Sequence, residues 1–417
     1  MNRSKGSHLT SLTGPVLRTL VGCAAILLIL GATAESATLV RFATFNASMY
    51  RSSYGRFSAD LQGGSDAQAK VIAEIIQRVN PDVLLVNEFD YDPTGASARL
   101  FTDEYLAVGQ GGASPILDYD YSFVAPSNTG VPSGVDLNGN GQTGDLGDTF
   151  GYGQFEGQYG MVLYSRFPIV EDAVRTFQTF LWADMPGALL PDNAATPAPG
   201  DWYSSQALSV FRLSSKSHWD VPVDVKGSIV HVLVSHPTPP VFDGPEDANG
   251  RRNHDEIRFW ADYIAPGAGG YIYDDNGSSG GIDSAGEGVH FVVMGDQNAD
   301  PFDGDSIPTA IRQLLSHSLI NAQPTPSAEG GAEQAQLQAG ANLLHSGDPA
   351  FDTGDFGDGP NAAGNLRVDY VLPSATLEIE DSGIFWPVSK DPLFHLVGTP
   401  PLPGSDHRLV WVDAVVP

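Results

Sequence analysis

The chain has 417 residues, of which 41% are hydrophobic and 17% charged, so it is long enough to bury a substantial core. Its formal net charge of −29, from 21 basic and 50 acidic residues, repels nucleic-acid phosphates at long range and argues against non-specific DNA binding. Composition therefore favours a soluble globular enzyme that acts on a substrate smaller than a polyanion, unless a local basic pocket overrules the net charge.

The first segment has the composition of a secretory signal peptide. Arg3, Lys5 and Arg18 precede an apolar run at residues 20–30, and small residues follow at 31–34. The apolar run is shorter than the roughly 20 residues that span a bilayer, which disfavours the alternative of an uncleaved anchor. We therefore expect residues 1–34 to be removed, leaving a secreted or periplasmic protein without a membrane span.

The only cysteine, Cys23, lies inside this predicted signal peptide. The mature chain would then have neither disulfides nor thiolate ligands. Any metal ion would have to be held by oxygen or imidazole groups, which favours hard divalent cations.

Hydrophobic periodicity predicts strands and helices within one continuous domain, residues 38–417. Strands are expected at residues 38–45, 82–86, 158–164, 205–213, 229–235, 290–294 and 366–372. Helices are expected at residues 67–79, 248–264 and 307–315. Because polar clusters follow several of these strands, we expect a site at strand ends on a rigid sheet.

Long segments rich in Gly, Pro, Asp and Ser interrupt this pattern. They cover about residues 91–153, 184–204, 267–288 and 323–364. Apolar strands occur on both sides of each segment, so we interpret them as surface loops of one domain rather than linkers. The last of them is the best candidate for disorder.

The segment Gly295-Asp296-Gln297-Asn298 follows an apolar strand and contains the residue types that phosphoester hydrolysis needs. Asp296 is suited to orient or deprotonate a water molecule, and Asn298 is suited to hold the anionic phosphorus centre. The alternative is a strand-ending turn whose side chains bond only to the backbone.

Ser405-Asp406-His407 places a carboxylate that could bind a metal beside an imidazole. Asp369 lies inside an apolar strand, where a lone carboxylate is costly to bury, so it requires a partner. His407 is favoured narrowly as that partner. Arg367 remains the alternative, because residues i and i+2 share one face of a strand.

Three further polar features stand near predicted strands. His236 closes an apolar strand and precedes prolines that force the chain off the sheet, which leaves its imidazole at the rim. Arg212 and Lys216 belong to a segment that is either suited to grip phosphate or is a solvated hairpin edge.

An acidic loop begins with the Asp-x-Asn-x-Asn-Gly spacing of a calcium-binding loop. Its oxygen atoms would come from Asp136, Asn138, Asn140 and Asp145. The twelfth position is Gly147 rather than an acid, so an ordinary Asx-rich loop is an equal alternative to a structural Ca²⁺ site.

Taken together, these motifs resemble the endonuclease/exonuclease/phosphatase superfamily, which has the deoxyribonuclease I-like fold, and an exported, bacterial-type member of it. The motifs occur in the expected order from about residue 38 to the C-terminus. They are Asn46, Glu88, residues 160–169, His236, Gly295-Asp296-Gln297-Asn298, Asp369 and Ser405-Asp406-His407.

The resemblance implies an α+β fold: a four-layered α/β sandwich of two packed, mostly antiparallel sheets flanked by helices. It also implies a divalent ion, Mg²⁺ or Mn²⁺, with Glu88 as the principal ligand, assisted by Asn46 and Asp406. Asp296 would activate the attacking water and Asn298 would hold the phosphate.

The same resemblance assigns roles to the two histidines. His407, oriented by Asp369, would stabilise charge on the phosphoryl oxygens, and His236 would protonate or stabilise the leaving oxygen. We therefore expect an exported, metal-dependent phosphoesterase that works as a monomer on a small molecule or nucleic acid. A secreted deoxyribonuclease I-like endonuclease and a catalytically inactive calcium-binding module are the alternatives.

Overall fold

The computed structural model describes residues 14, 37–193, 195–196, 200–282, 288–359 and 362–417. Residues 37–417 form one compact unit. The predicted signal peptide lies outside the described residues, apart from Gly14. Within the described ranges, no helix combines the length and the apolar character needed to cross a bilayer.

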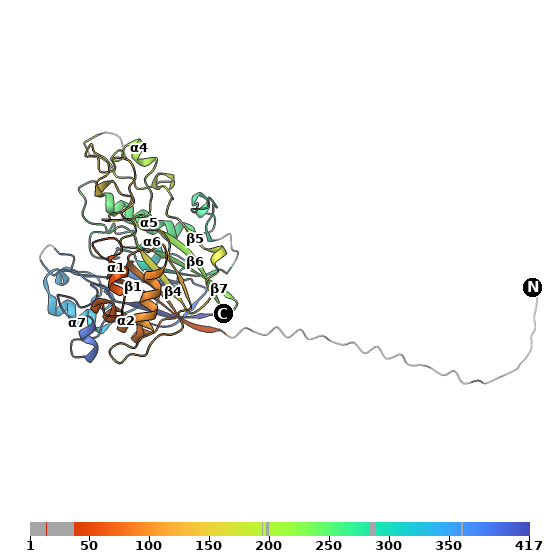
Figure 1. The fold of residues 1–417 in the computed structure, drawn as a ribbon. Coiled ribbons are helices and arrows are strands. Elements are labelled where there is room, and N and C mark those ends of the chain that lie inside the picture. Colours follow the sequence, from red (N-terminus) through yellow and green to blue (C-terminus); the bar gives the residue numbers. More distant parts are fainter. Residues whose placement is uncertain (1–13, 15–36, 194, 197–199, 283–287, 360–361) are drawn as a thin grey trace, which may run out of the picture. The chain divides into compact units, whose positions relative to one another are not determined.

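Two β-sheets form the centre of this unit (Figure 1). The described chain gives a six-stranded sheet in the order β12-β13-β1-β2-β4-β3 and a five-stranded sheet in the order β11-β8-β7-β6-β5. Two neighbouring pairs, β1–β2 and β7–β8, are parallel and the rest are antiparallel. The strands are β1 Thr38–Met49, β2 Val83–Phe89, β3 Tyr121–Phe123, β4 Met161–Ser165, β5 Arg175–Thr176, β6 His218–Val225, β7 Ser228–Ser235, β8 His290–Asp296, β9 Gly354–Asp355, β10 Asn365–Leu366, β11 Asp369–Pro373, β12 Glu378–Ile384 and β13 Val410–Val416.

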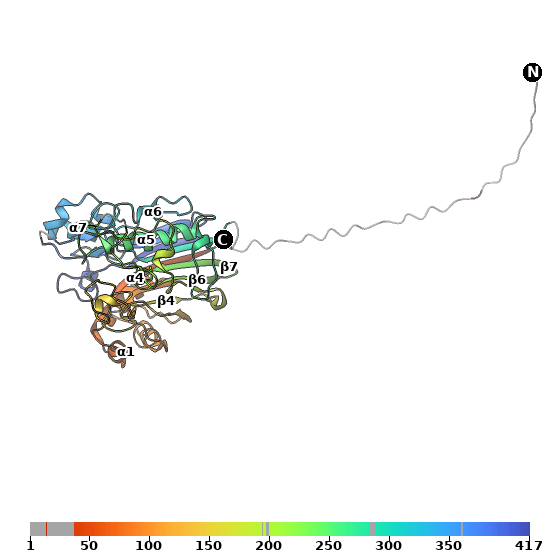
Figure 2. The same cartoon turned by 90° about the horizontal axis from the view of Figure 1, so that it is seen from above.

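Three apolar cores separate four layers, as the resemblance implied. One core lies between the sheets, one between the six-stranded sheet and α2 and α3, and one between the five-stranded sheet and α5. Figure 2 shows α5 and α1 on opposite sides of the strands. The α-helices are α1 Arg56–Leu61, α2 Ala67–Val79, α3 Ala96–Phe101, α4 Ser205–Leu208, α5 Ala248–Ile264, α6 Arg312–Leu315 and α7 Glu329–Gln338.

Helix α2 shows why the periodic segments fold as predicted. The Asp66 side chain caps its start by accepting a hydrogen bond from the Ala69 amide at 2.8 Å. Asn80, in the left-handed conformation (φ 55°), ends it. Its apolar side chains recur at helical spacing, and Ile72 and Ile76 are fully buried. Truncating either isoleucine to alanine would cost about 2–5 kcal/mol.

Three predictions of local structure are wrong. The expected strand at 205–213 is α4 followed by irregular chain, because the Ser204 hydroxyl caps a helical turn by accepting from the Ala207 amide at 3.1 Å. The expected helix at 307–315 is only the short α6. The segment expected to be disordered contains α7, where Gly330 lies so close to Trp386 that a Cβ would be 2.1 Å from the Trp386 carbonyl oxygen.

The topology brings the predicted motif residues to one edge of the sandwich. The parallel pairs β1–β2 and β7–β8 end together, beside Asn46, Glu88, His236 and Asp296. β11 runs antiparallel to β8, and its first residue, Asp369, pairs in register with Asp296. β13 runs antiparallel to β1 in the same way, which brings the preceding Ser405-Asp406-His407 segment to that edge.

Candidate active site

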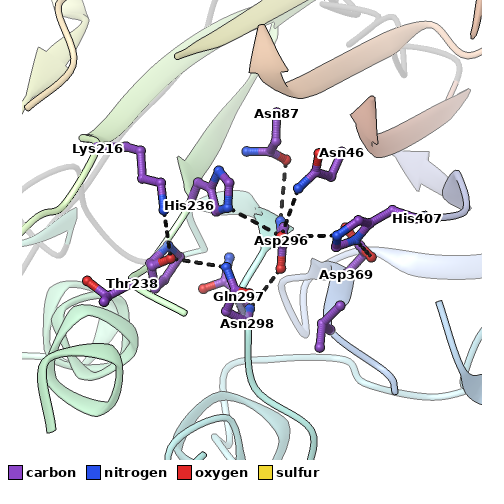
Figure 3. Close-up of polar contacts among 12 residues, drawn as sticks. Asn46, Asn87, Lys216, His236, Thr238, Asp296, Gln297, Asn298, Asp369 and His407 are labelled. Atoms are coloured by element: carbon purple, nitrogen blue, oxygen red, sulfur yellow. Dashed lines mark hydrogen bonds and ion pairs between the residues drawn. The ribbon is translucent and has the colours of Figure 1, made fainter. Parts of the chain in front are cut away.

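Asp296 lies at the centre of the site, where several side chains from different strands converge (Figure 3). The Asn46 Nδ2 group donates to its Oδ2 at 3.0 Å, and the Asn298 amide donates to its Oδ1 at 2.8 Å. The preceding Gly295 has φ 138°, and a Cβ there would lie 2.0 Å from the Ser235 carbonyl oxygen. Glycine is therefore required to turn Asp296 into the site.

Two imidazoles flank this carboxylate. His236 Nε2 lies 3.3 Å and His407 Nε2 lies 3.8 Å from Asp296 Oδ2. Burial alone would raise the pKa of Asp296, but the charge of His407 and the hydrogen bonds from His236 and Asn46 outweigh it and lower the pKa. Asp296 is therefore ionised at neutral pH although its side chain is only 1% exposed.

The two histidines have opposite charge states. Burial, aided by the nearby Lys216 ammonium, lowers the pKa of His236 to about 4, so this ring is neutral. Burial also disfavours the charged form of His407, but Asp369 and Asp296 overcome it and raise its pKa well above the usual value. His407 is therefore an imidazolium.

Asp369 is the partner of His407. Its Oδ2 lies 2.8 Å from His407 Nδ1, and Thr353 Oγ1 accepts hydrogen bonds from both the Asp369 and the Val368 amides at 3.0 Å. Arg367, the alternative partner, stacks on the Tyr370 ring at 4.7 Å instead. Burial raises the pKa of Asp369 and the His407 charge opposes this rise. The pair fixes the tautomer and orientation of His407.

Two of the predicted metal ligands, Asn46 and Glu88, lie on the six-stranded sheet, and the third, Asp406, precedes its strand β13. Ser48 links two of them: its amide donates to Asn46 Oδ1 at 3.1 Å and its hydroxyl to Asp406 Oδ1 at 2.9 Å. Burial raises the pKa of Glu88 to about 7, and His407 and the Asn46 side chain only partly offset it. The charged form of Glu88 therefore lacks a sufficient cationic partner.

Three non-glycine residues at this edge have left-handed backbones. They are Ser48 (φ 48°), Glu88 (φ 58°) and Asn298 (φ 51°). The pairing of β1 with β2 also shifts register between Asn46 and Met49. Each left-handed residue costs on the order of 1–3 kcal/mol, and such strain persists where the surrounding structure fixes the backbone. The site is therefore held in place before any ligand arrives.

Of the two basic residues predicted to bind phosphate, Lys216 lies beside Asn298 in the site, whereas Arg212 contacts other residues. Lys216 Nζ and Asn298 Nδ2 both donate to the Pro237 carbonyl oxygen at 3.2 Å. Burial lowers the pKa of Lys216, whereas Glu256, Glu88 and Asp296 oppose this shift. Arg212 instead donates to Asn128 Oδ1 at 2.7 Å and stacks over Phe150.

The sequence pattern of the Endonuclease/Exonuclease/phosphatase family matches residues 43–407. The chain belongs to this family. Its members are generally phosphoester hydrolases and typically use divalent metals. A comparison with curated proteins found no match.

Several solved structures are similar to this chain at low identity, and two of them are endonuclease/exonuclease/phosphatase proteins. One from Beutenbergia cavernae has 16% identity and a TM-score of 0.47, over 91% of this chain and 72% of its own. A family protein from Leptotrichia buccalis has 13% identity and a TM-score of 0.45, over 90% and 99%. Sphingomyelinase C from Streptomyces griseocarneus has 15% identity and a TM-score of 0.43, over 90% and 99%.

The residues at this edge offer two sets of ligands for a family-type divalent metal. Asp296, Asp369 and His407 are buried and present ligand atoms within 4.8 Å of one another. However, Asp369 and His407 already satisfy each other with a hydrogen bond. Glu88, with Asp406 and Asn46, presents hard oxygen atoms and an uncompensated carboxylate. This second set fits a metal ion better.

The carboxylates of the acidic loop accept hydrogen bonds from groups of the same loop. Asp136 accepts from the Gly139 and Gly141 amides at 2.7 and 2.8 Å. Asp145 accepts from the side-chain amides of Asn138 and Asn140 at 3.0 and 2.6 Å. These contacts are typical of Asx-rich turns. A structural calcium ion in this loop stays a prediction.

Sequence reasoning missed residues that position the site through backbone hydrogen bonds. Buried Glu256 accepts from the Ser215 and Thr238 amides at 2.6 Å, which joins the loops that carry Lys216 and His236. Asn87 Oδ1 accepts from the Asp296 amide at 3.3 Å. A charged residue on the buried face of α5 is the signal that would have singled out Glu256, because such a group requires partners.

Proposed function

We propose that this chain is an exported, divalent-metal-dependent phosphoesterase that hydrolyses phosphomonoesters or phosphodiesters by in-line attack of an activated water. The observation that carries the proposal is the charge pattern around Asp296. The Asp296 carboxylate lies 3.3 Å from His236 Nε2 and 3.8 Å from His407 Nε2; burial lowers the pKa of His236, whereas Asp369 and Asp296 raise that of His407. Such opposed pKa shifts assign distinct acid and base roles to neighbouring groups.

Asp296 is the base in this mechanism. Its Oδ1 and Oδ2 are fixed by Asn298 and Asn46, so the carboxylate is oriented before water arrives. The ionised form accepts a proton from the attacking water as the oxygen–phosphorus bond forms.

His407 and its neighbours stabilise the charge that develops on the phosphoryl oxygens. The imidazolium, held by Asp369, offers its Nε2 proton toward the centre. The side-chain amide of Asn298 and the ammonium of Lys216, which both contact the Pro237 carbonyl oxygen, add donors on the side of Asp296 away from His407. Donors arranged in advance around a transition state stabilise it strongly because they need little reorganisation.

His236 faces the leaving oxygen in this proposal. Because its ring is neutral, it carries one N–H and no stored proton, so it would stabilise the leaving oxygen by sharing with it the N–H that otherwise faces Asp296. Glu88, Asp406 and Asn46 would hold Mg²⁺ or Mn²⁺. The ion, when bound, polarises the phosphoryl group and neutralises part of its charge.

Export rests on the sequence of residues 1–34 and places the mature enzyme in the periplasm or outside the cell. We expect it to act as a monomer without a stable protein partner.

A panel assay of the mature chain tests this function. The substrates are plasmid DNA, bis(p-nitrophenyl) phosphate, p-nitrophenyl phosphate, sphingomyelin and inositol phosphates, each with Mg²⁺, Mn²⁺ or Ca²⁺. We expect metal-dependent hydrolysis of small esters and weak action on DNA, because the net charge of −29 opposes a polyanion. Efficient plasmid cleavage would support the endonuclease alternative, and no hydrolysis at all would contradict an enzyme.

A further inference from the structure

A pocket of about 220 Å³ opens between the segments that follow β1 and β2. Its volume far exceeds the roughly 10–15 Å³ that a single water molecule needs. Four aromatic residues and two carboxylates contribute to its wall: Tyr54, Phe57, Tyr91, Phe155, Asp90 and Asp92. None of the described residues that line it is a lysine, arginine or histidine.

The pocket is close to the proposed metal ligand Glu88. Asp90 follows Glu88 by two residues, so their Cα atoms are at most about 7 Å apart. Asp90 accepts hydrogen bonds from the Tyr159 amide at 3.1 Å and the Arg51 amide at 2.8 Å. The pocket is therefore within reach of a substituent only a few atoms long on a phosphate held at Glu88.

A pair of tyrosines feels the charges of both Glu88 and Asp90. The rings of Tyr50 and Tyr159 have centroids 4.6 Å apart. Burial raises the pKa of both phenols, and the charges of Glu88 and Asp90 add to the rise. Both tyrosines are therefore within electrostatic reach of the metal side of the site and of the acidic wall of the pocket.

The wall has the chemistry that recognises an organic cation. Tyr54 packs edge-on against Phe155 at 5.9 Å, and Tyr54 is 66% exposed, so the aromatic pair is open to a ligand. Aromatic faces attract cations, and quaternary ammonium groups in particular bind in aromatic cages.

Among the described residues, no lysine, arginine or histidine side chain forms an ion pair with Asp90 or Asp92. Asp92 accepts from Thr94 and from the Ser97 amide, and Asp90 accepts only backbone amides. Two guanidinium groups near the wall already have partners: that of Arg51 pairs with Asp60 at 2.9 Å and Asp66 at 3.1 Å, and that of Arg99 donates to the Thr94 carbonyl at 3.0 Å. A positively charged ligand would supply the ion-pair partner that Asp90 and Asp92 lack.

We infer that this pocket binds an alkylammonium group of the substrate, which a short chain connects to the phosphate held at Glu88. The inference rests on the proposed function and narrows its substrate class to zwitterionic phosphodiesters, in which a phosphate and an ammonium are separated by a short chain. The net charge of −29 acts in the same direction, because it attracts cationic groups and repels polyanions.

A pair of chromogenic diesters tests this inference. p-Nitrophenyl phosphocholine carries the ammonium group, and p-nitrophenyl 3,3-dimethylbutyl phosphate replaces its nitrogen with carbon at equal size. With Mn²⁺, we expect kcat/KM to be about tenfold higher for the cationic ester, as one aromatic-cage contact supplies.

Two variants locate the effect. In Tyr54→Leu and Asp92→Asn the ratio of the two kcat/KM values should fall toward one, while kcat/KM for the neutral ester stays within about twofold. Tyr121→Leu, on the edge strand β3, is the matched control and should keep the wild-type ratio. Thermal unfolding of each variant checks that it is folded.

Two natural substrates distinguish the possible sources of the alkylammonium group: glycerophosphocholine in solution and phosphatidylcholine in vesicles. Cleavage of the first supports a soluble ligand and cleavage of the second a lipid headgroup. Cleavage of neither, by an enzyme that cleaves the neutral ester, would overturn the inference. So would equal kcat/KM for the chromogenic pair, or a preference that survives in both pocket variants. If no ester is hydrolysed with any metal, the proposed function fails instead.

Discussion

Two acidic regions of this molecule contain the same kinds of side chain in different surroundings. In the loop at residues 136–148, Asp145 is exposed and accepts hydrogen bonds only from its own loop. At the strand ends, Asp296 and Asp369 are each 1% exposed and face imidazoles. The two regions therefore differ in the burial and the charged neighbours of their carboxylates, not in residue type.

The pKa values express the same difference. Hydrogen bonds from Asn140 and the Gly147 amide lower the pKa of Asp145, so that carboxylate stays charged. Burial raises the pKa of Glu88 to about 7, close to the pH at which the enzyme would work.

The largest effect is expected for Asp296→Asn. The substitution keeps the shape of the side chain but removes the base, so kcat on bis(p-nitrophenyl) phosphate should fall by about 10³-fold or more. The matched loop variant Asp145→Asn should keep wild-type kcat. Retained thermal unfolding in both would exclude loss of fold, and equal activity of the two variants would contradict the role of Asp296.

His407→Ala should lower kcat by about 10²–10³-fold, because it removes a donor aimed at the developing charge. His395→Ala, which changes an exposed histidine bonded to the Pro392 carbonyl, is its control. Steady-state kinetics of both variants decide the matter. A loss confined to KM would mean that His407 binds substrate without stabilising the transition state.

Asp369→Asn should lower kcat by about 10–100-fold by releasing the orientation of His407. It should also shift the pH profile. Asp369 helps to raise the pKa of His407, so without it the imidazolium loses its proton at lower pH and the basic limb of kcat moves down. An unmoved basic limb would contradict the pairing. The exposed Asp381→Asn on β12 is the control.

Asp352 tests the effect of burial on a carboxylate apart from catalysis, because it is buried outside the site. Burial, with Asp300, Asp303 and Asp348 nearby, raises its pKa from 3.8 to about 8. Between these values the folded protein holds a proton that the unfolded chain has lost, so stability falls as pH rises. Asp352→Asn should therefore unfold at a higher temperature than wild type at pH 8 and at a similar temperature at pH 4. Parallel curves of Tm against pH would contradict this.

The smallest effect on activity is expected in the loop. Asp136→Ala removes an acceptor of the Gly139 and Gly141 amides and should cost about 1 kcal/mol of stability, with kcat/KM within twofold of wild type. The calcium prediction adds a second measurement: Ca²⁺ should raise Tm of the wild type but not of Asp136→Ala. A rise in both would place the ion elsewhere.

Periodicity predicted most of the fold because buried faces leave a regular pattern. Helices α2 and α5 have the boundaries expected, and most of the core strands lie where apolar runs occur. The wrong strand at 205–213 has apolar residues that pack in the core, and it pairs with its neighbour through an isolated bridge between Arg212 and Leu181 rather than through a ladder. The ordered helix α7 depends on Gly330 and Gly331 packing against distant residues, a contact that local composition does not show.

The motif residues that follow strands were also predictable, since chemistry restricts their types. Residues that act through the backbone were not. Thr353 holds the Asp369 amide from inside a segment expected to be disordered, and Glu256 joins two loops from a helix. Arg212 was selected for its charge, but its guanidinium contacts Asn128 and Phe150. Such roles depend on tertiary packing rather than on residue type.

The central claim is that Glu88, Asp296 and His407 together perform metal-dependent phosphoester hydrolysis. Its most direct test is the rate of bis(p-nitrophenyl) phosphate hydrolysis against Mg²⁺ or Mn²⁺ concentration, for wild type, Glu88→Gln and the exposed control Glu378→Gln on β12. We predict a saturable metal dependence that EDTA abolishes, unchanged in Glu378→Gln and shifted to much higher metal concentration in Glu88→Gln. Hydrolysis that persists in EDTA, or an identical metal dependence in all three proteins, would contradict it.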